Sequence, residues 1–170
     1  MKRLTLTKTL LLFILPAVLF AFTTRPDKAM FTGSWKLNED KSELGDFGGR
    51  FAPRKIKVDQ KDDAITIAKT SPSFNGGDPN TTTETLSYDG KVSESTGFGN
   101  SKKKSTLKWS DDGQSMTITY TITFERNGET SELKGTETWT LSADGKNLTA
   151  NISSTSSQGE FTMKEVFDKE

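Results

Sequence analysis

Four glutamates share the period-two spacing of apolar neighbours in strand-like segments. A carboxylate buried among apolar side chains is costly unless it is paired. Two such groups could form the acid/base pair of a glycosidase, and one alone could anchor the polar end of a ligand. We favour the interpretation that these strands run past the rim of a barrel and the glutamates reach water, with a ligand anchor next and catalysis last. The glutamates and one apolar residue in step with each are Glu84 with Leu86, Glu94 with Val92, Glu137 with Trp139 and Glu165 with Met163.

The sequence contains no histidine and no cysteine. Their absence excludes Ser-His-Asp and Cys-His catalysis, and also His- or Cys-bound zinc, iron–sulfur clusters and His-ligated haem. The acidic pairs Asp62-Asp63 and Asp111-Asp112 lack the ligand spacing of an EF-hand and are better explained as turns. We therefore expect no catalytic residues, no enzymatic activity, no metal site and no cofactor.

The charge of the chain argues against a nucleic-acid partner. The chain has 170 residues, of which 23 are basic and 23 acidic, and its first 23 residues contain three of the bases and none of the acids. The remainder therefore has a formal charge of −3, which suits phosphate neutralisation poorly. The run from Lys102 to Lys104 is one short basic patch, and we interpret it as a solvated strand end.

Residues 1–23 have the pattern of a secretory signal peptide. Lys2, Arg3 and Lys8 precede an apolar stretch over 10–22, which is shorter than the roughly 20 residues that span a bilayer. The alternative is a retained N-terminal anchor. We predict a signal peptide over 1–23, a linker over 24–30 and one domain over 31–170, exported to the periplasm or the extracellular space and not spanning a membrane after cleavage.

The rest of the sequence alternates between apolar and polar residues. In residues 115–125 every second side chain is apolar and threonines stand between them, so one face of a strand is apolar and the other carries hydroxyl groups. No segment has helical periodicity. We predict about ten strands, over residues 31–37, 55–60, 64–69, 81–88, 91–98, 105–109, 115–125, 133–141, 147–154 and 159–167.

Tight-turn dipeptides separate several of these strands. Because Asp, Asn and Gly tolerate positive φ, each dipeptide predicts a two-residue hairpin between neighbouring antiparallel strands. A long meander of hairpins hides its edges by closing. The predicted fold is therefore all-β, a single antiparallel meander β-barrel of about 8–10 strands, with the long segments 38–54 and 70–80 as candidate mouth or lid. The dipeptides are Asp89-Gly90, Asp112-Gly113, Asn127-Gly128 and Asp144-Gly145.

The first predicted strand contains Gly33-x-Trp35, which resembles the opening motif of lipocalins and related calycin barrels. Residues 37–42 followed by Gly45 and Pro53, and residues 137–146, resemble small exported bacterial proteins of the lipocalin-like kind. The resemblance implies a barrel whose closed end is covered by Trp35. It also implies a late basic residue stacked on that Trp, which we do not assign, and binding of small apolar ligands.

Strand parity selects the residues expected to point inward. A barrel of this size holds one small molecule or is filled by its own side chains, and the sequence leaves both open. The expected function is that of an exported soluble barrel whose partner is a small, largely apolar molecule. One alternative is a non-catalytic structural or interaction protein of the cell envelope with a filled core, and an outer-membrane barrel is weaker because most strands are short. The expected cavity-lining residues are Trp35, Met116, Ile118, Tyr120, Ile122, Phe124, Glu137, Trp139, Phe161 and Met163.

Overall fold

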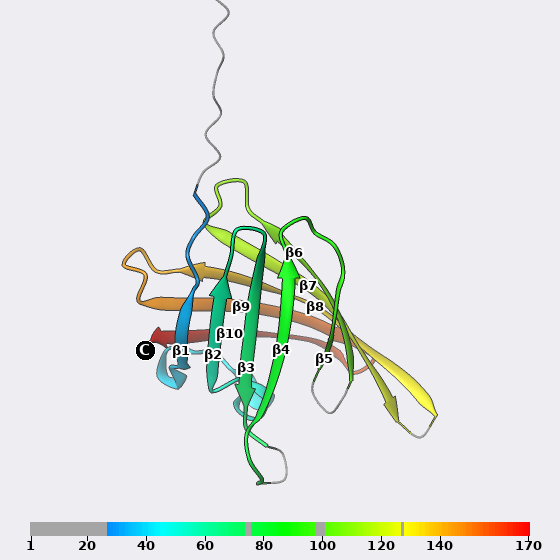
Figure 1. Ribbon diagram of the computed structural model, residues 1–170. Coiled ribbons are helices and arrows are strands. Elements are labelled where there is room, and N and C mark those ends of the chain that lie inside the picture. The colour runs from blue at the N-terminus through cyan, green and yellow to red at the C-terminus, as the bar shows by residue number, and fades with distance from the viewer. Residues whose placement is uncertain (1–26, 74–75, 98–100, 127) are drawn as a thin grey trace, which may run out of the picture.

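The described part of the chain folds into ten antiparallel strands and two short helices, which confirms the all-β prediction (Figure 1). The computed structural model describes residues 27–73, 76–97, 101–126 and 128–170, so the expected signal peptide and part of the linker lie outside the described residues. The strands are β1 Gly33–Leu37, β2 Lys55–Gln60, β3 Ala64–Ser71, β4 Asn80–Ser87, β5 Ser93–Thr96, β6 Lys102–Trp109, β7 Ser115–Arg126, β8 Glu129–Leu141, β9 Asn147–Ser156 and β10 Gly159–Lys169. The helices are the 3-10 helix η1 Glu39–Lys41 and the α-helix α1 Gly45–Phe51.

The strands form a nearly closed barrel. Their order is β4-β3-β2-β1-β10-β9-β8-β7-β6-β5, so the first and last strands of the chain pair and the two edges of the sheet are β4 and β5. The Ser93 hydroxyl donates a hydrogen bond to the Thr85 carbonyl at 2.6 Å between these two edges. The expectation that Asp89-Gly90 joins paired strands was wrong, because β4 pairs with β3 and β5 with β6.

Two of the other predicted turns share one construction. In each, a serine hydroxyl donates to an aspartate two residues later at 2.6 Å, and the following glycine has a positive φ of 70° or 67°. The connections are longer than the expected two residues, since they span 110–114 and 142–146. Positive φ at Gly113 and Gly145 explains why glycine follows aspartate in both sequences.

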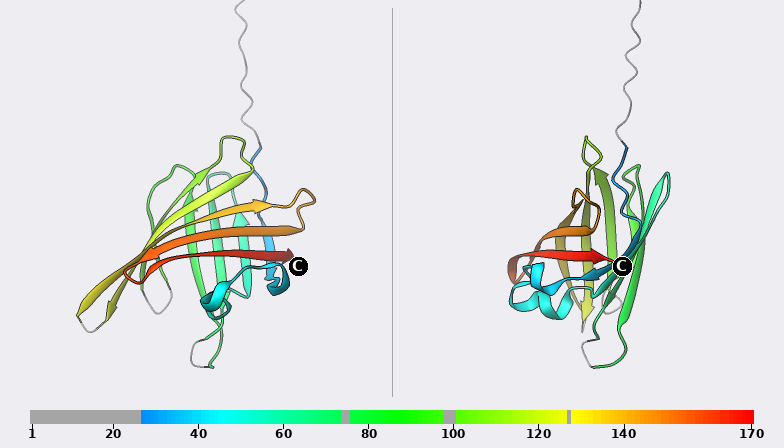
Figure 2. Two further views of the ribbon diagram at one scale, coloured as in Figure 1. Left: turned by 180° about the vertical axis from the view of Figure 1, so that it is seen from behind. Right: turned by 90° about the vertical axis from the view of Figure 1, so that its left-hand side faces the viewer.

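The expectation of a chain without helix was wrong for the segment between β1 and β2. This segment forms η1 and α1, which lie together below β10, at the opposite end of the barrel from the β6–β7 connection (Figure 2). A seven-residue helix is too short to be stable alone, and α1 is held by contact: a Cβ at Gly48 would lie 2.7 Å from the Met163 sulfur. In the described part of the chain, no helix is long and apolar enough to cross a membrane.

The apolar core fills the end of the barrel near the β6–β7 connection. Trp35 is fully buried there, and its indole N–H donates to the Phe31 carbonyl at 2.9 Å. The Lys169 ammonium lies 5.3 Å from the centre of the Trp35 ring, so a basic residue late in the chain does lie against this ring. The other fully buried large apolar side chains of this core are Phe31, Ile56, Ile65, Ile67, Leu86, Met116, Ile118, Trp139, Leu148 and Phe167.

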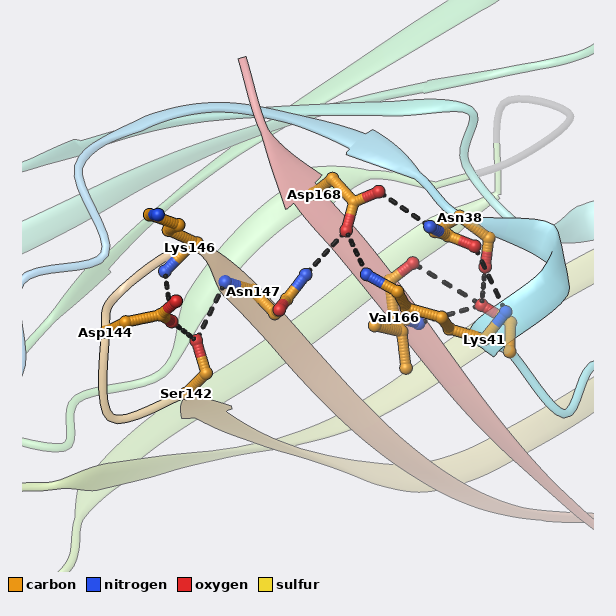
Figure 3. A network of polar contacts seen from close by, with 9 residues as sticks. Asn38, Lys41, Ser142, Asp144, Lys146, Asn147, Val166 and Asp168 are labelled. Carbon is orange, nitrogen blue, oxygen red and sulfur yellow. Dashed lines mark hydrogen bonds and ion pairs between the residues drawn. The ribbon is translucent and has the colours of Figure 1, made fainter.

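A polar network centred on Asp168 attaches η1 to the barrel (Figure 3). The Asp168 carboxylate accepts hydrogen bonds from Asn38 at 2.6 Å, from Lys41 at 3.0 Å and from Asn147. These donors lie next to β1, in η1 and in β9. One carboxylate on β10 therefore connects three elements that are distant in sequence.

Candidate binding cavity

The inward-facing side chains of each long strand change character along its length. On β7, Met116 and Ile118 are fully buried in the core, Tyr120 comes next, and Ile122 and Phe124 lie beyond it, partly exposed. The same order from apolar core to polar group recurs on β3, β4, β6, β8 and β10. A set of buried polar side chains, which we call the polar layer, therefore separates the filled end of the barrel from its open end. The charged members of the polar layer are Lys69, Glu84, Lys103, Glu137 and Glu165.

Two ion pairs occupy most of the polar layer. The Lys69 ammonium lies 2.6 Å from Glu137 Oε2, and the side chains are only 17% and 8% exposed. The indole N–H of Trp139 donates to the same carboxylate oxygen at 3.1 Å. Because the pair is buried and its hydrogen bonds are short, removing either partner would leave an uncompensated charge.

The second ion pair joins strands on either side of the gap between β4 and β5. Lys103 Nζ lies 2.7 Å from Glu84 Oε1, and the Ser105 hydroxyl donates to Glu84 Oε2 at 3.0 Å. Both oxygens of this carboxylate thus have a donor. The Tyr120 hydroxyl shares a 2.6 Å hydrogen bond with the Ser154 hydroxyl.

Electrostatic attraction decides the protonation states of the first pair. Burial by itself would raise the pKa of the Glu137 carboxyl, but the ammonium groups of Lys69 and Lys103 outweigh it and hold this pKa at about 2. Burial would likewise lower the pKa of Lys69, yet the nearby carboxylates, Glu137 foremost, raise it above its usual value. Both groups are charged at neutral pH.

Glu165 differs from the other two buried glutamates. Its residue is 2% exposed, and among the described residues nothing donates a hydrogen bond to its carboxyl group. Burial raises the pKa of Glu165 to about 7, and the negative charge of Glu137 adds to this effect, while Lys69 opposes it. Glu165 therefore carries a titratable carboxyl group that has no committed partner.

A cavity of about 750 Å³ opens above the polar layer. This volume lies within the range of roughly 300–1,000 Å³ that is typical of small-molecule sites. The two long segments singled out as candidate mouth or lid both contribute to the lining, for example through Leu44 and Pro72. The five charged members of the polar layer line the cavity, and its apolar lining includes Ile67, Ile122, Phe124, Leu133, Ile152, Phe161 and Met163.

The structure brings six of the ten predicted lining residues to this cavity. They are Tyr120, Ile122, Phe124, Glu137, Phe161 and Met163. Trp35, Met116, Ile118 and Trp139 do not line it, because they pack in the core on the other side of the polar layer. Strand parity assigns these four to the correct face but cannot state their depth in the barrel. That the six bind a ligand stays a prediction.

The expectation that the glutamates reach water was wrong for three of the four. Glu84, Glu137 and Glu165 are buried in the polar layer. Glu94 does reach water, since its side chain is 72% exposed and forms an outer ion pair with Lys104 at 3.1 Å. Lys69 and Lys103 neutralise two of the buried carboxylates and so offset the free-energy cost of burying them.

Those lysines were missed from the sequence. The interpretation of the run from Lys102 to Lys104 as a solvated strand end was wrong for its middle residue, because Lys103 points inward and is 12% exposed. Parity carried the signal, since Lys103 is in step with Leu107 and Lys69 is in step with Ile67. A lysine in step with apolar residues marks a candidate partner for a buried glutamate.

No family model matches this chain, and no curated protein matches its sequence. Among solved structures, the chain is similar to zebrafish ileal bile acid-binding protein in a crystal structure complexed with cholic acid. The two share 18% sequence identity with a TM-score of 0.54, and the match covers 82% of this chain and 98% of the other. This likeness shows the fold alone: an all-β, nearly closed barrel, which has ten antiparallel strands in the described residues.

Proposed function

We propose that this protein binds a small, largely apolar molecule inside its barrel and performs no catalysis. The observation that carries the proposal is the cavity of about 750 Å³ with a mainly apolar wall and a floor of buried charged groups. Sites for small molecules are typically concave and apolar, with a few polar groups that orient the ligand. The alternative of a filled core describes only the end of the barrel near the β6–β7 connection.

The fold neighbour supports the same proposal. The structure that this chain resembles is a bile acid-binding protein in complex with cholic acid. Barrels of this architecture can enclose a ligand because strand closure leaves an interior lined by alternate side chains. At 18% sequence identity, the likeness supports binding in the interior and no particular ligand.

We further propose that the protein acts outside the cytoplasm as a lipocalin-like exported protein. The support is the basic residues Lys2, Arg3 and Lys8 ahead of an apolar stretch over 10–22. Expression of the full chain in a bacterial host, followed by fractionation and intact-mass measurement, tests this. The expected result is a chain shortened by about 23 residues in the periplasm or medium, and a full-length cytoplasmic chain would contradict it.

Binding is tested with N-phenyl-1-naphthylamine, an uncharged apolar fluorophore. We expect saturable enhancement of its fluorescence with one site per chain. The variant Ile122→Trp, which adds bulk to the cavity wall, should weaken binding by at least about tenfold, because the added volume occupies the site.

The matched control is Thr119→Trp on the same strand. Thr119 is exposed on the outer face of β7, so this variant adds an indole that cannot enter the cavity. Its affinity for the fluorophore should equal that of the wild type. Non-saturable fluorescence, or equal affinity of all three proteins, would place the probe on the surface and overturn the proposal.

A further inference from the structure

Among the described side chains, those buried inside the barrel include an odd number of charged groups. Three carboxylates, those of Glu84, Glu137 and Glu165, face two ammonium groups, those of Lys69 and Lys103. With every group ionised, the polar layer has a formal charge of −1. In the described part of the lining, the other charged side chains are Arg50, Glu132 and Glu160, which are exposed to solvent around the mouth and do not change the balance at the floor.

Both lysines are committed to partners. Lys69 lies 2.6 Å from one oxygen of Glu137, and Lys103 lies 2.7 Å from one oxygen of Glu84. An anionic ligand would have to displace a glutamate from its lysine and leave that glutamate buried and unpaired. Such a loss is strongly unfavourable. The floor of the cavity is therefore unsuited to a ligand with a carboxylate.

Glu165 provides the opposite chemistry. Its residue is 2% exposed, it lines the cavity, and within the described residues its carboxyl accepts no hydrogen bond. On β10 it lies between Phe167 of the core and Met163 of the cavity wall, so it is the last polar group before the open space. The Glu165 carboxyl faces the cavity with no protein donor in the described residues, so a donor that the ligand brings can reach it.

We propose that the cavity selects a cationic amphiphile, an apolar body with a primary or secondary ammonium group that donates to the Glu165 carboxylate. The ammonium cancels the formal charge of the polar layer and supplies the missing donor. The apolar body then lies against Ile122, Phe124 and Phe161 toward the mouth. This inference rests on the proposed function, since it names the ligand class for the same cavity.

The test compares three ligands with one chain length: decylamine, decanol and decanoate. Each competes with N-phenyl-1-naphthylamine for the wild-type protein at pH 8, where decylamine is protonated and Glu165 is ionised. We expect decylamine to bind at least about tenfold more tightly than decanol and decanoate at least about tenfold more weakly, because a charge-assisted hydrogen bond forms in one case and like charges meet in the other.

The variant Glu165→Gln removes the charge and keeps the shape. It should weaken decylamine by at least about tenfold while changing decanol by less than about threefold. The variant Glu160→Gln alters an exposed carboxylate of the lining at the mouth on the same strand, and it should weaken decylamine by less than Glu165→Gln does. The control Glu94→Gln alters an exposed carboxylate outside the lining, and it should leave all three affinities within about threefold of the wild type.

The outcomes separate the two proposals. If none of the three ligands displaces the fluorophore and the fluorophore itself does not bind, the proposed function fails. If decanol binds but decylamine has no advantage, or decanoate binds most tightly, only the cationic preference is overturned. Equal weakening of decylamine by Glu160→Gln and Glu165→Gln would place the ammonium at the mouth. Equal weakening of decanol and decylamine by Glu165→Gln would show a hydroxyl preference. Either result also overturns the cationic preference.

Discussion

Replacing Glu165 with glutamine should make the protein more stable, and more so as the pH rises. The carboxyl group is buried without a hydrogen-bond donor in the described residues, and burial raises its pKa from 4.5 to about 7. A raised pKa means that the folded state disfavours the charged form. Glutamine has nearly the same shape and carries no charge, so Glu165→Gln removes this unfavourable burial.

Proton linkage gives the sign and the size of this change in the free energy of unfolding. Below pH 4.5 Glu165 is protonated in both the folded and the unfolded state, and the burial of its charge costs nothing. Between pH 4.5 and about 7 the unfolded state has already lost the proton that the folded state keeps, so the stability of the wild type falls. Above pH 7 the cost is complete, and at 1.36 kcal/mol per pKa unit it amounts to about 3 kcal/mol.

Urea denaturation at pH 5, 6, 7 and 8 measures this effect. The difference in free energy of unfolding between Glu165→Gln and the wild type should grow by about 2 to 3 kcal/mol from pH 5 to pH 8, with the m-value unchanged. The control Glu94→Gln, at an exposed glutamate in a surface ion pair, should change the free energy of unfolding by less than about 1 kcal/mol. A pH-independent difference for Glu165→Gln would refute the assignment of an unpaired buried carboxyl group.

Three further perturbations examine the rest of the interior and its attachment to η1. Lys69→Met should destabilise the fold by about 3 to 5 kcal/mol in urea denaturation, because Glu137 stays charged and buried, and the double variant Lys69→Met/Glu137→Gln should recover most of the loss; no recovery would mean that lost packing dominates. Gly135→Ala should lower the free energy of unfolding by about 2 kcal/mol or more in the same assay, since its Cβ would lie 2.5 Å from the Ser154 hydroxyl and 2.7 Å from a backbone carbonyl. A variant as stable as the wild type would contradict this contact. Asp168→Ala should speed hydrogen–deuterium exchange of the η1 amides, because the Asn38 and Lys41 side chains lose their shared acceptor; unchanged exchange would show that η1 is held by other contacts.

The sequence alone predicted the fold because its signals are local. Alternation over residues 115–125 makes one face of a strand apolar whatever the rest of the chain does. Glycine after aspartate or asparagine gives turns that tolerate positive φ, as Gly113 and Gly145 show. The helices between β1 and β2 were missed because α1 is short and glycine-rich, and contact with Met163 holds it in place.

Depth within the barrel was decided only by the tertiary structure. Met116 and Ile122 have the same parity on one strand, yet the first lies in the core and the second on the cavity wall. The parity of a residue on its strand fixes the face of the sheet from which its side chain projects. Its depth along the barrel axis depends on the register of every strand between it and its neighbours.

The same limit applies to the charges. Lys69 and Glu137 lie 68 residues apart in sequence and come within 2.6 Å only once β3 and β8 face each other across the closed sheet. The sequence by itself determined about ten alternating strands, the positions of the turns at Gly113 and Gly145, and the absence of histidine and cysteine chemistry. Which carboxylates form an ion pair with a lysine, and that Glu165 forms none with the described residues, depends on long-range register, because a charge is neutralised by what is near it in space and not in sequence.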